Sequence, residues 1–225
     1  MKYIILTGAS RGIGEALCRK LLSKNHHLLC VSRKKNESLI AFAHSQKHKM
    51  DYFEFDLNNV NEIDEFMKKV IEKIDSSNVR SMYLINNAGI VFNQLIEETD
   101  PTSIIQMMNI NLVSPMILTS CFIKYSEQFN VEKKILNVSS GSSYNLSSGG
   151  SCYSTSKAGL ETFTKSIGIE KLNVKIMAIR LGMVDTDMHG ATENKKMLKT
   201  PEYAADRILT FLMHKFEHGK TVKAW

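Results

Sequence analysis

The sequence predicts a doubly wound α/β domain, in which a parallel sheet carries helices on both faces. Short apolar runs alternate with amphipathic stretches along all 225 residues. Those stretches are long enough to form the crossover helices that parallel strands require. No internal repeat, low-complexity tract or Pro/Gly-rich linker interrupts the pattern. We therefore expect residues 1–225 to form a single domain, a three-layer sandwich.

Apolar runs that are short and end at glycine or polar residues predict the strands. They are Tyr3–Leu6, His27–Val31, Tyr52–Phe55, Met82–Ile85, Ile135–Val138 and Val174–Leu181, with Thr221–Trp225 as a short closing strand. Apolar residues at helical spacing, twice preceded by a proline suited to a helix start, predict the helices. They are Gly14–Leu22, Val60–Ile74, Pro101–Phe129, Tyr153–Glu170 and Pro201–His214. Because ligands of such sheets bind beyond the carboxyl ends of the strands, the residues after each apolar run are the functional candidates.

Composition and charge exclude several functions. With 43% apolar and 23% charged residues, the chain is typical of a globular protein. The net charge is +6, but the lysines are spread along the chain, so we expect no nucleic-acid partner. No apolar run approaches a membrane span, and the apolar start is too short for a signal peptide; we expect a cytoplasmic protein without a membrane partner. The four cysteines lack metal-ligand spacing, which predicts no metal site.

A glycine-rich turn follows the first predicted strand and opens the first helix. Its sequence is Thr7-Gly8-Ala9-Ser10-Arg11-Gly12-Ile13-Gly14. Glycines let the backbone approach a pyrophosphate, and the N–H groups of the helix start attract that anion. Any strand-to-helix connection can use glycine, but this position between strand and helix favours a Rossmann-type dinucleotide site. We expect the cofactor to contact Gly8, Ser10, Arg11, Gly12, Ile13 and Gly14.

The turn after the second strand predicts which dinucleotide binds. It reads Ser32-Arg33-Lys34-Lys35 and lacks the carboxylate that would bind the ribose 2′-hydroxyl of NAD. A small hydroxyl and adjacent cations suit a 2′-phosphate instead, and Arg11 could close on the same group. These residues predict NADP(H), with Ser32 and Arg33 as contacts. A solvated basic turn is the alternative interpretation.

The pair Tyr153 and Lys157 is the main catalytic candidate. Residues four apart share one face of a helix, so both side chains point to the same place. A nearby ammonium favours the phenolate, and we expect Lys157 to lower the pKa of Tyr153, as acid–base catalysis at neutral pH requires. Taken alone, the spacing is also that of a chance surface pair.

Together these motifs resemble the short-chain dehydrogenase/reductase family, from Thr7 to Thr186. The glycine spacing, Asn86-Asn87-Ala88-Gly89 and Tyr153-Ser154-Thr155-Ser156-Lys157 carry the likeness. The resemblance implies that Asp56 and Leu57 meet the adenine and that Asn87, Ala88 and Gly89 approach the cofactor closely. It implies that Ser140 holds the substrate oxygen and that Asn111 anchors a relay water, with Asn109 as the competing candidate. Gly182, Val184 and Thr186 would contact the cofactor in a motif where Leu181 replaces the family's proline.

Within the family the sequence is most similar to the sepiapterin reductase and bacterial benzil reductase branch. The closer likeness lies in Leu84–Gly89, Ser114–Thr119, Asn137–Gly141 and Val184–Met188. The resemblance implies NADPH-dependent hydride transfer to a ketone or vicinal dicarbonyl, with Tyr153 as proton donor. Pterin side-chain reduction and a non-catalytic NADP sensor remain alternatives. A serine hydrolase built on Ser140 is disfavoured because no Gly-x-Ser-x-Gly elbow surrounds that residue.

Two further expectations concern the surface. The segment Asp187–Thr200 is short, with Met188 and Met197 as its main large apolar residues, so we expect it to cover the site incompletely. The helix Pro101–Phe129 is apolar on more than one side, which predicts a homodimer or homotetramer. Its apolar residues are Ile104, Ile105, Met107, Met108, Leu112, Ile117, Leu118 and Phe122.

Overall fold

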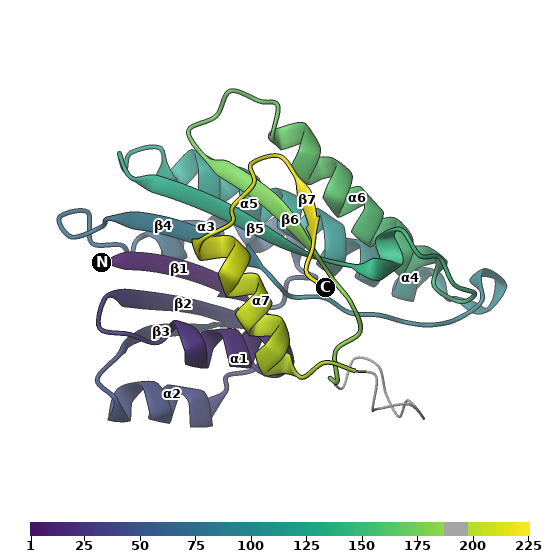
Figure 1. Ribbon diagram of the computed structural model, residues 1–225, viewed down its shortest axis with the longest axis horizontal. Helices are drawn as coiled ribbons and strands as arrows, with labels where there is room; N and C mark the ends of the chain where they lie inside the picture. The colour runs from purple at the N-terminus through teal and green to yellow at the C-terminus, as the bar shows by residue number, and fades with distance from the viewer. Residues whose placement is uncertain (187–197) are drawn as a thin grey trace.

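A computed structural model describes residues 1–186 and 198–225, and within them the chain forms a seven-stranded sheet (Figure 1). The strand order is β3-β2-β1-β4-β5-β6-β7, and each neighbouring pair is parallel. The strands are β1 Lys2–Thr7, β2 His26–Ser32, β3 Lys49–Glu54, β4 Ser81–Asn86, β5 Glu132–Ser140, β6 Lys175–Leu181 and β7 Thr221–Lys223. The predicted doubly wound parallel sheet is confirmed.

Helices cover both faces of the sheet. They are α1 Gly12–Leu21, α2 Glu37–Ser45, α3 Ile63–Ile71, α4 Pro101–Met108, α5 Ser114–Ser126, α6 Ser151–Ile167 and α7 Pro201–Met213. One predicted helix, Pro101–Phe129, is in fact α4 and α5 joined by a π-helical turn, Asn109–Val113. Helix α2 was missed by the sequence analysis because it buries only Leu39 and Ala43, too few for a clear apolar stripe.

Alternate residues of the central strands belong to two separate cores. In β1, Ile4 and Leu6 pack with α1 and α7, whereas Tyr3 and Ile5 pack with α3 and α5. Figure 1 shows α1 and α7 in front of the sheet and α3 and α5 behind it. Burial on both faces explains why the central strands read as continuous apolar runs instead of alternating ones.

The long helical run requires one correction. Pro101–Ser126 is long and apolar enough to cross a membrane, so the expectation that no run approaches that length is wrong. Met107, Leu118 and Phe122 from this run are fully buried. The last two lie in the core shared with α3, so the run packs as a core helix does.

Candidate active site

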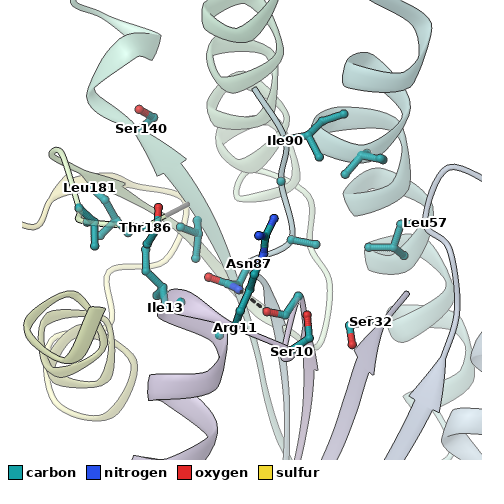
Figure 2. A pocket seen from close by; sticks show the side chains of 18 of the residues that line it. Ser10, Arg11, Ile13, Ser32, Leu57, Asn87, Ile90, Ser140, Leu181 and Thr186 are labelled. Carbon is teal, nitrogen blue, oxygen red and sulfur yellow. Dashed lines mark hydrogen bonds between the residues drawn. The ribbon is translucent and has the colours of Figure 1, made fainter. Parts of the chain in front are cut away.

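A cleft of about 810 Å³ lies at the carboxyl ends of the strands. It opens beside β1 and β4, where the order of strand connections reverses, the usual ligand position in a doubly wound sheet. Figure 2 shows side chains from the β1 turn, the β4 loop and the segment after β6 around one space. All the residues predicted to contact the cofactor line this cleft: Gly8, Ser10, Arg11, Gly12, Ile13, Gly14, Ser32, Arg33, Asp56, Leu57, Asn87, Ala88, Gly89, Tyr153, Lys157, Gly182, Val184 and Thr186.

The glycine turn is built for close approach of backbone to ligand. Gly8 has φ +72°, a left-handed conformation that favours glycine. A Cβ on Gly14 would lie 1.9 Å from the Gly8 carbonyl oxygen, so no side chain fits there. Thr7 Oγ1 accepts from the backbone N–H of Asn87 and of Ala88, both at 3.1 Å. The start of helix α1 is thereby locked beside the β4 loop, and the resulting cradle fits a dinucleotide pyrophosphate.

The turn after β2 places cations at the far end of this cradle. Arg33 and Lys34 are exposed and line the cleft. Asn36 holds the turn in place, because its Nδ2 donates to the Ser10 carbonyl at 2.9 Å and its Oδ1 caps α2. Ser32 Oγ donates to the Lys34 carbonyl oxygen at 2.7 Å and lies 2.7 Å from the Tyr52 hydroxyl. The Ser32 hydroxyl proton is therefore already donated to a backbone carbonyl, so Arg33 and Lys34 are the better ligands for a phosphate.

The predicted catalytic residues Ser140, Tyr153 and Lys157 meet in the same cleft. Ser140 ends β5, and the other two lie on successive turns of α6. The Lys157 ammonium nitrogen donates to the Val138 carbonyl oxygen at 3.1 Å and lies 5.8 Å from the centre of the Tyr153 ring. A proton donor, a hydroxyl and a buried amine thus converge on one space, the arrangement that acid–base chemistry needs.

Burial dominates the acidity of this pair. It raises the pKa of Tyr153 above 10.0, although the Ser140 hydroxyl acts in the opposite direction. It also lowers the pKa of Lys157 to about 8. Both shifts favour the neutral form, as desolvation does. The prediction that the pKa of Tyr153 is lowered is therefore wrong, because burial, and not the neighbouring Lys157, sets the direction of its shift.

Asn111 lies behind the cleft instead of lining it. It is fully buried in the π-helical turn. Its Oδ1 accepts from the Ile90 N–H at 2.8 Å, and its Nδ2 donates to the Ile90 carbonyl at 2.8 Å and to Ser156 Oγ at 3.2 Å. The competing candidate, Asn109, donates instead to Asn58. Asn111 is thus the asparagine that joins the β4 loop to helix α6.

Several residues that line the cleft were missed by the sequence analysis. Most are immediate neighbours of predicted residues, so motif boundaries drawn one residue wider would have found them. Val138 is the exception, because it lies inside β5, two residues before Ser140. The missed residues are Lys34, Phe55, Ile90, Ile110, Val138, Ser139, Leu181 and Asp185.

The segment after β6 frames the open side of the cleft. Leu181, at the position of the family's proline, ends β6 in register with Ser140. Val184 pairs with Lys199, and the Asp185 N–H donates to the Lys199 carbonyl at 2.8 Å. Residues 187–197, with Met188 and Met197, lie outside the described residues. In the described parts of the chain, no group of three His, Cys, Asp or Glu side chains is placed to hold a metal ion.

Comparison with known proteins identifies the family. The model of the short chain dehydrogenase family matches residues 2–197. The chain belongs to the short-chain dehydrogenase/reductase family. It is 33% identical to a benzil reductase ((S)-benzoin forming) of Bacillus cereus, with 99% of each chain covered. It is 27% identical to a sepiapterin reductase of Xenopus tropicalis, over 97% of this chain and 85% of that one. The predicted resemblance to this branch is confirmed, and the protein is an oxidoreductase.

Solved structures confirm the fold. An alcohol dehydrogenase from Thermococcus sibiricus, complexed with 5-hydroxy-NADP, matches with a TM-score of 0.84 and 24% identity, covering 99% of this chain and 95% of that one. Some matching structures hold NADP and others hold NADH, so the likeness in fold does not choose between the two cofactors.

The buried ammonium predicts a gain in stability for Lys157→Met. The unfolded chain hydrates this ammonium, with a pKa of 10.5 against about 8 in the folded state, so burial costs up to about 3 kcal/mol at pH 7. Between pH 8 and 10.5 the unfolded chain binds more protons, so the wild type gains stability as the pH rises. Urea unfolding at pH 7 and pH 10 should show the Met variant more stable, with a smaller advantage at pH 10. An equal or larger advantage at pH 10 would contradict the assignment.

Proposed function

We propose that the protein is an NADPH-dependent carbonyl reductase that reduces one carbonyl of a vicinal dicarbonyl compound. The observation that carries this proposal is the convergence of Ser140, Tyr153 and Lys157 beside the glycine cradle in one cleft. The likeness to benzil reductase over the full chain supports the substrate class. The bound cofactor would supply the hydride to the carbonyl carbon.

The chain's own residues would orient the substrate and move the proton. Ser140 would hold the carbonyl oxygen, and Tyr153 would donate a proton to it. Because burial keeps the pKa of Tyr153 above 10.0, the phenol is protonated at neutral pH, as an acid must be. Lys157 would bind the nicotinamide ribose and stabilise the phenolate formed. Its pKa of about 8 lets the amine pass a proton on near neutral pH.

Asn111 would complete the proton relay as a positioning residue. Its amide bonds hold Ile90, which lines the cleft, and Ser156, next to Lys157 on α6. Asn111 therefore holds the β4 loop and α6 at a fixed spacing beside the cleft.

The function test compares substrates. Tyr144 and Leu146, in the loop between Ser140 and Tyr153, are 77% and 76% exposed, and Met183 beside Gly182 is 54% exposed. Exposed apolar side chains in the segments that follow Ser140 and Gly182 would suit flat aromatic substrates, which bind through their own apolar area. We expect benzil to be reduced with a much higher kcat/KM than acetone or cyclohexanone in steady-state assays with NADPH. Monoketones that match benzil would rule out the substrate class, and a preference for sepiapterin would establish the pterin alternative.

The variant Tyr153→Phe tests whether Tyr153 is the proton donor. The ring still packs, and only the proton donor is lost, so activity should fall by about 10²–10⁴-fold while NADPH still binds in a fluorescence titration. A wild type that binds NADPH but reduces no carbonyl would identify a sensor instead of an enzyme.

Cofactor choice is the second test. Arg11, Arg33 and Lys34 line the cleft, and no carboxylate follows β2 directly, which supports a 2′-phosphate. We expect the wild type to use NADPH better than NADH, and Arg33→Asp to reduce kcat/KM for NADPH more than for NADH. Equal or better turnover of the wild type with NADH would reject the assignment. Lys47→Asp, which changes charge equally on a residue that does not line the cleft, is the control.

We also propose a homodimer or homotetramer. The structure reduces the apolar surface on which this proposal rests, because Met107, Leu118 and Phe122 are fully buried in the core. What remains on α4 and α5 is Ile105, 59% exposed, Met116, 38% exposed, and half-buried neighbours such as Ile104. Association would cover these side chains. Light scattering after size exclusion should give two or four times the chain mass of 25.5 kDa. A monomer at micromolar concentration would contradict this.

A further inference from the structure

A buried acidic side chain lies behind the catalytic residues, where the proposed mechanism does not use it. Glu161 is 5% exposed and follows Lys157 by one turn on the same face of α6. A buried carboxylate is costly unless it is paired and hydrogen-bonded. Arg180 of β6 supplies the pair, with its Nε 3.0 Å from Oε1 and a terminal nitrogen bonded to Oε2. Burial raises the pKa of Glu161, but Arg180 and two serine hydroxyls outweigh it and hold the pKa below 4.5.

The two serines that bond Glu161 stand on either side of Ser140. Ser139 Oγ donates to Glu161 Oε1 at 2.7 Å, and Ser143 Oγ lies 2.5 Å from the same oxygen. Ser143 Oγ is also 2.8 Å from the Ser140 carbonyl oxygen, so one hydroxyl proton is shared between the two acceptors. The carboxylate therefore holds the turn after β5 at two points. One is Ser139, immediately before Ser140, and the other is Ser143, three residues after it.

Arg180 extends this contact to the other side of the cleft. It faces Ser139 in the register of β5 and β6, and it precedes Leu181 and Gly182, which line the cleft. Its guanidinium carbon also lies 5.9 Å from the ring centre of Tyr144, the residue after the β5 turn. One ion pair thus joins three elements: α6 with Tyr153 and Lys157, the end of β5, and the end of β6.

We propose that Glu161, paired with Arg180, is a positioning residue that holds the Ser140 hydroxyl in place for the substrate oxygen beside Tyr153. The role of Ser140 itself rests on the proposed function. Ser140 Oγ accepts from the Ser142 N–H at 3.2 Å and lies 3.4 Å from Ser142 Oγ, both within the turn, and the same hydroxyl acts on Tyr153 across the cleft. Its place therefore depends on the turn, and the turn is tied to the rest of the domain by Glu161. A misplacement of about 1 Å at a reacting group can cost about 10²-fold in rate.

The chain offers a matched control. Asn137 Nδ2 donates to Thr164 Oγ1 at 2.9 Å, and both residues are fully buried. This bond joins the same strand and helix, β5 and α6, but neither residue lines the cleft. If Glu161 only stabilised the packing of α6 on the sheet, Glu161→Gln and Thr164→Val would affect the enzyme alike.

The decisive experiment is a double-mutant cycle on the full-length enzyme, with benzil and NADPH as probes. Glu161→Gln keeps the size of the side chain and one acceptor oxygen but removes the charge. We expect it to lower kcat by about 10–100-fold, with NADPH affinity changed less than about threefold. In a Ser140→Ala background the same change should lower kcat by less than about twofold, because the group that Glu161 positions is already gone. Thr164→Val should lower the melting temperature and leave kcat within about twofold.

Two results would overturn the proposal. One is a folded Glu161→Gln enzyme with at least half the wild-type kcat, and the other is an equal loss of kcat with and without Ser140. If Glu161→Gln does not fold, Ser143→Ala takes its place in the cycle, since it removes one bond of the turn from a partly exposed position. A wild type that binds NADPH but does not reduce benzil, or any other carbonyl, would refute the proposed function itself. That result is distinct, because Glu161 is judged by its dependence on Ser140 in an active enzyme.

Discussion

Burial of the sheet on both faces confines the chemistry of this protein to one edge. All six residues of β4 are buried, and alternate strand residues enter the two cores. A catalytic group in mid-strand would have to lie in a packed apolar layer, where an unpaired polar atom is costly. Because all the strands are parallel, their carboxyl ends meet at the same edge. The glycine turn, the β4 loop, Ser140 and Gly182 come together there as a consequence of topology.

The same constraint explains how much could be predicted from the sequence. Each strand end is marked locally by glycine or polar residues, so the sheet and most of the residues that line the cleft follow from linear motifs. Helix α2 and the π-helical turn carry no such mark. The turn is associated with three bonds from Asn111 to Ile90 and Ser156, residues distant in the sequence. Local spacing contains no information about those partners, and a single long helix was the simpler interpretation.

Two properties of site residues could not be predicted from local spacing. The Ser32 hydroxyl, which stays a predicted cofactor contact, also bonds the Lys34 carbonyl and the hydroxyl of Tyr52, twenty residues later. The spacing of Tyr153 and Lys157 suggested attraction between charges, yet the depth of the pair decides its acidity. Desolvation acts on both groups and favours neutral forms. How deeply these side chains are buried depends on the assembled domain, so it cannot be predicted from the sequence of α6 alone.

Two buried charged side chains one turn apart on α6 illustrate how one helix serves both scaffold and chemistry. Glu161 has four bonds, two from Arg180 and two from serines, and these hold its pKa low in spite of burial. Within the described parts of the chain, Lys157 donates one hydrogen bond, to the Val138 carbonyl, and burial brings its pKa to about 8. A fully bonded charge keeps its protonation state and fixes the geometry around it. A buried charge with one bond changes its protonation state near neutral pH, which is what proton transfer requires. The difference lies in the number of partners that β5 and β6 provide, so the two strands that shape the cleft also decide which charge on α6 can take part in the reaction.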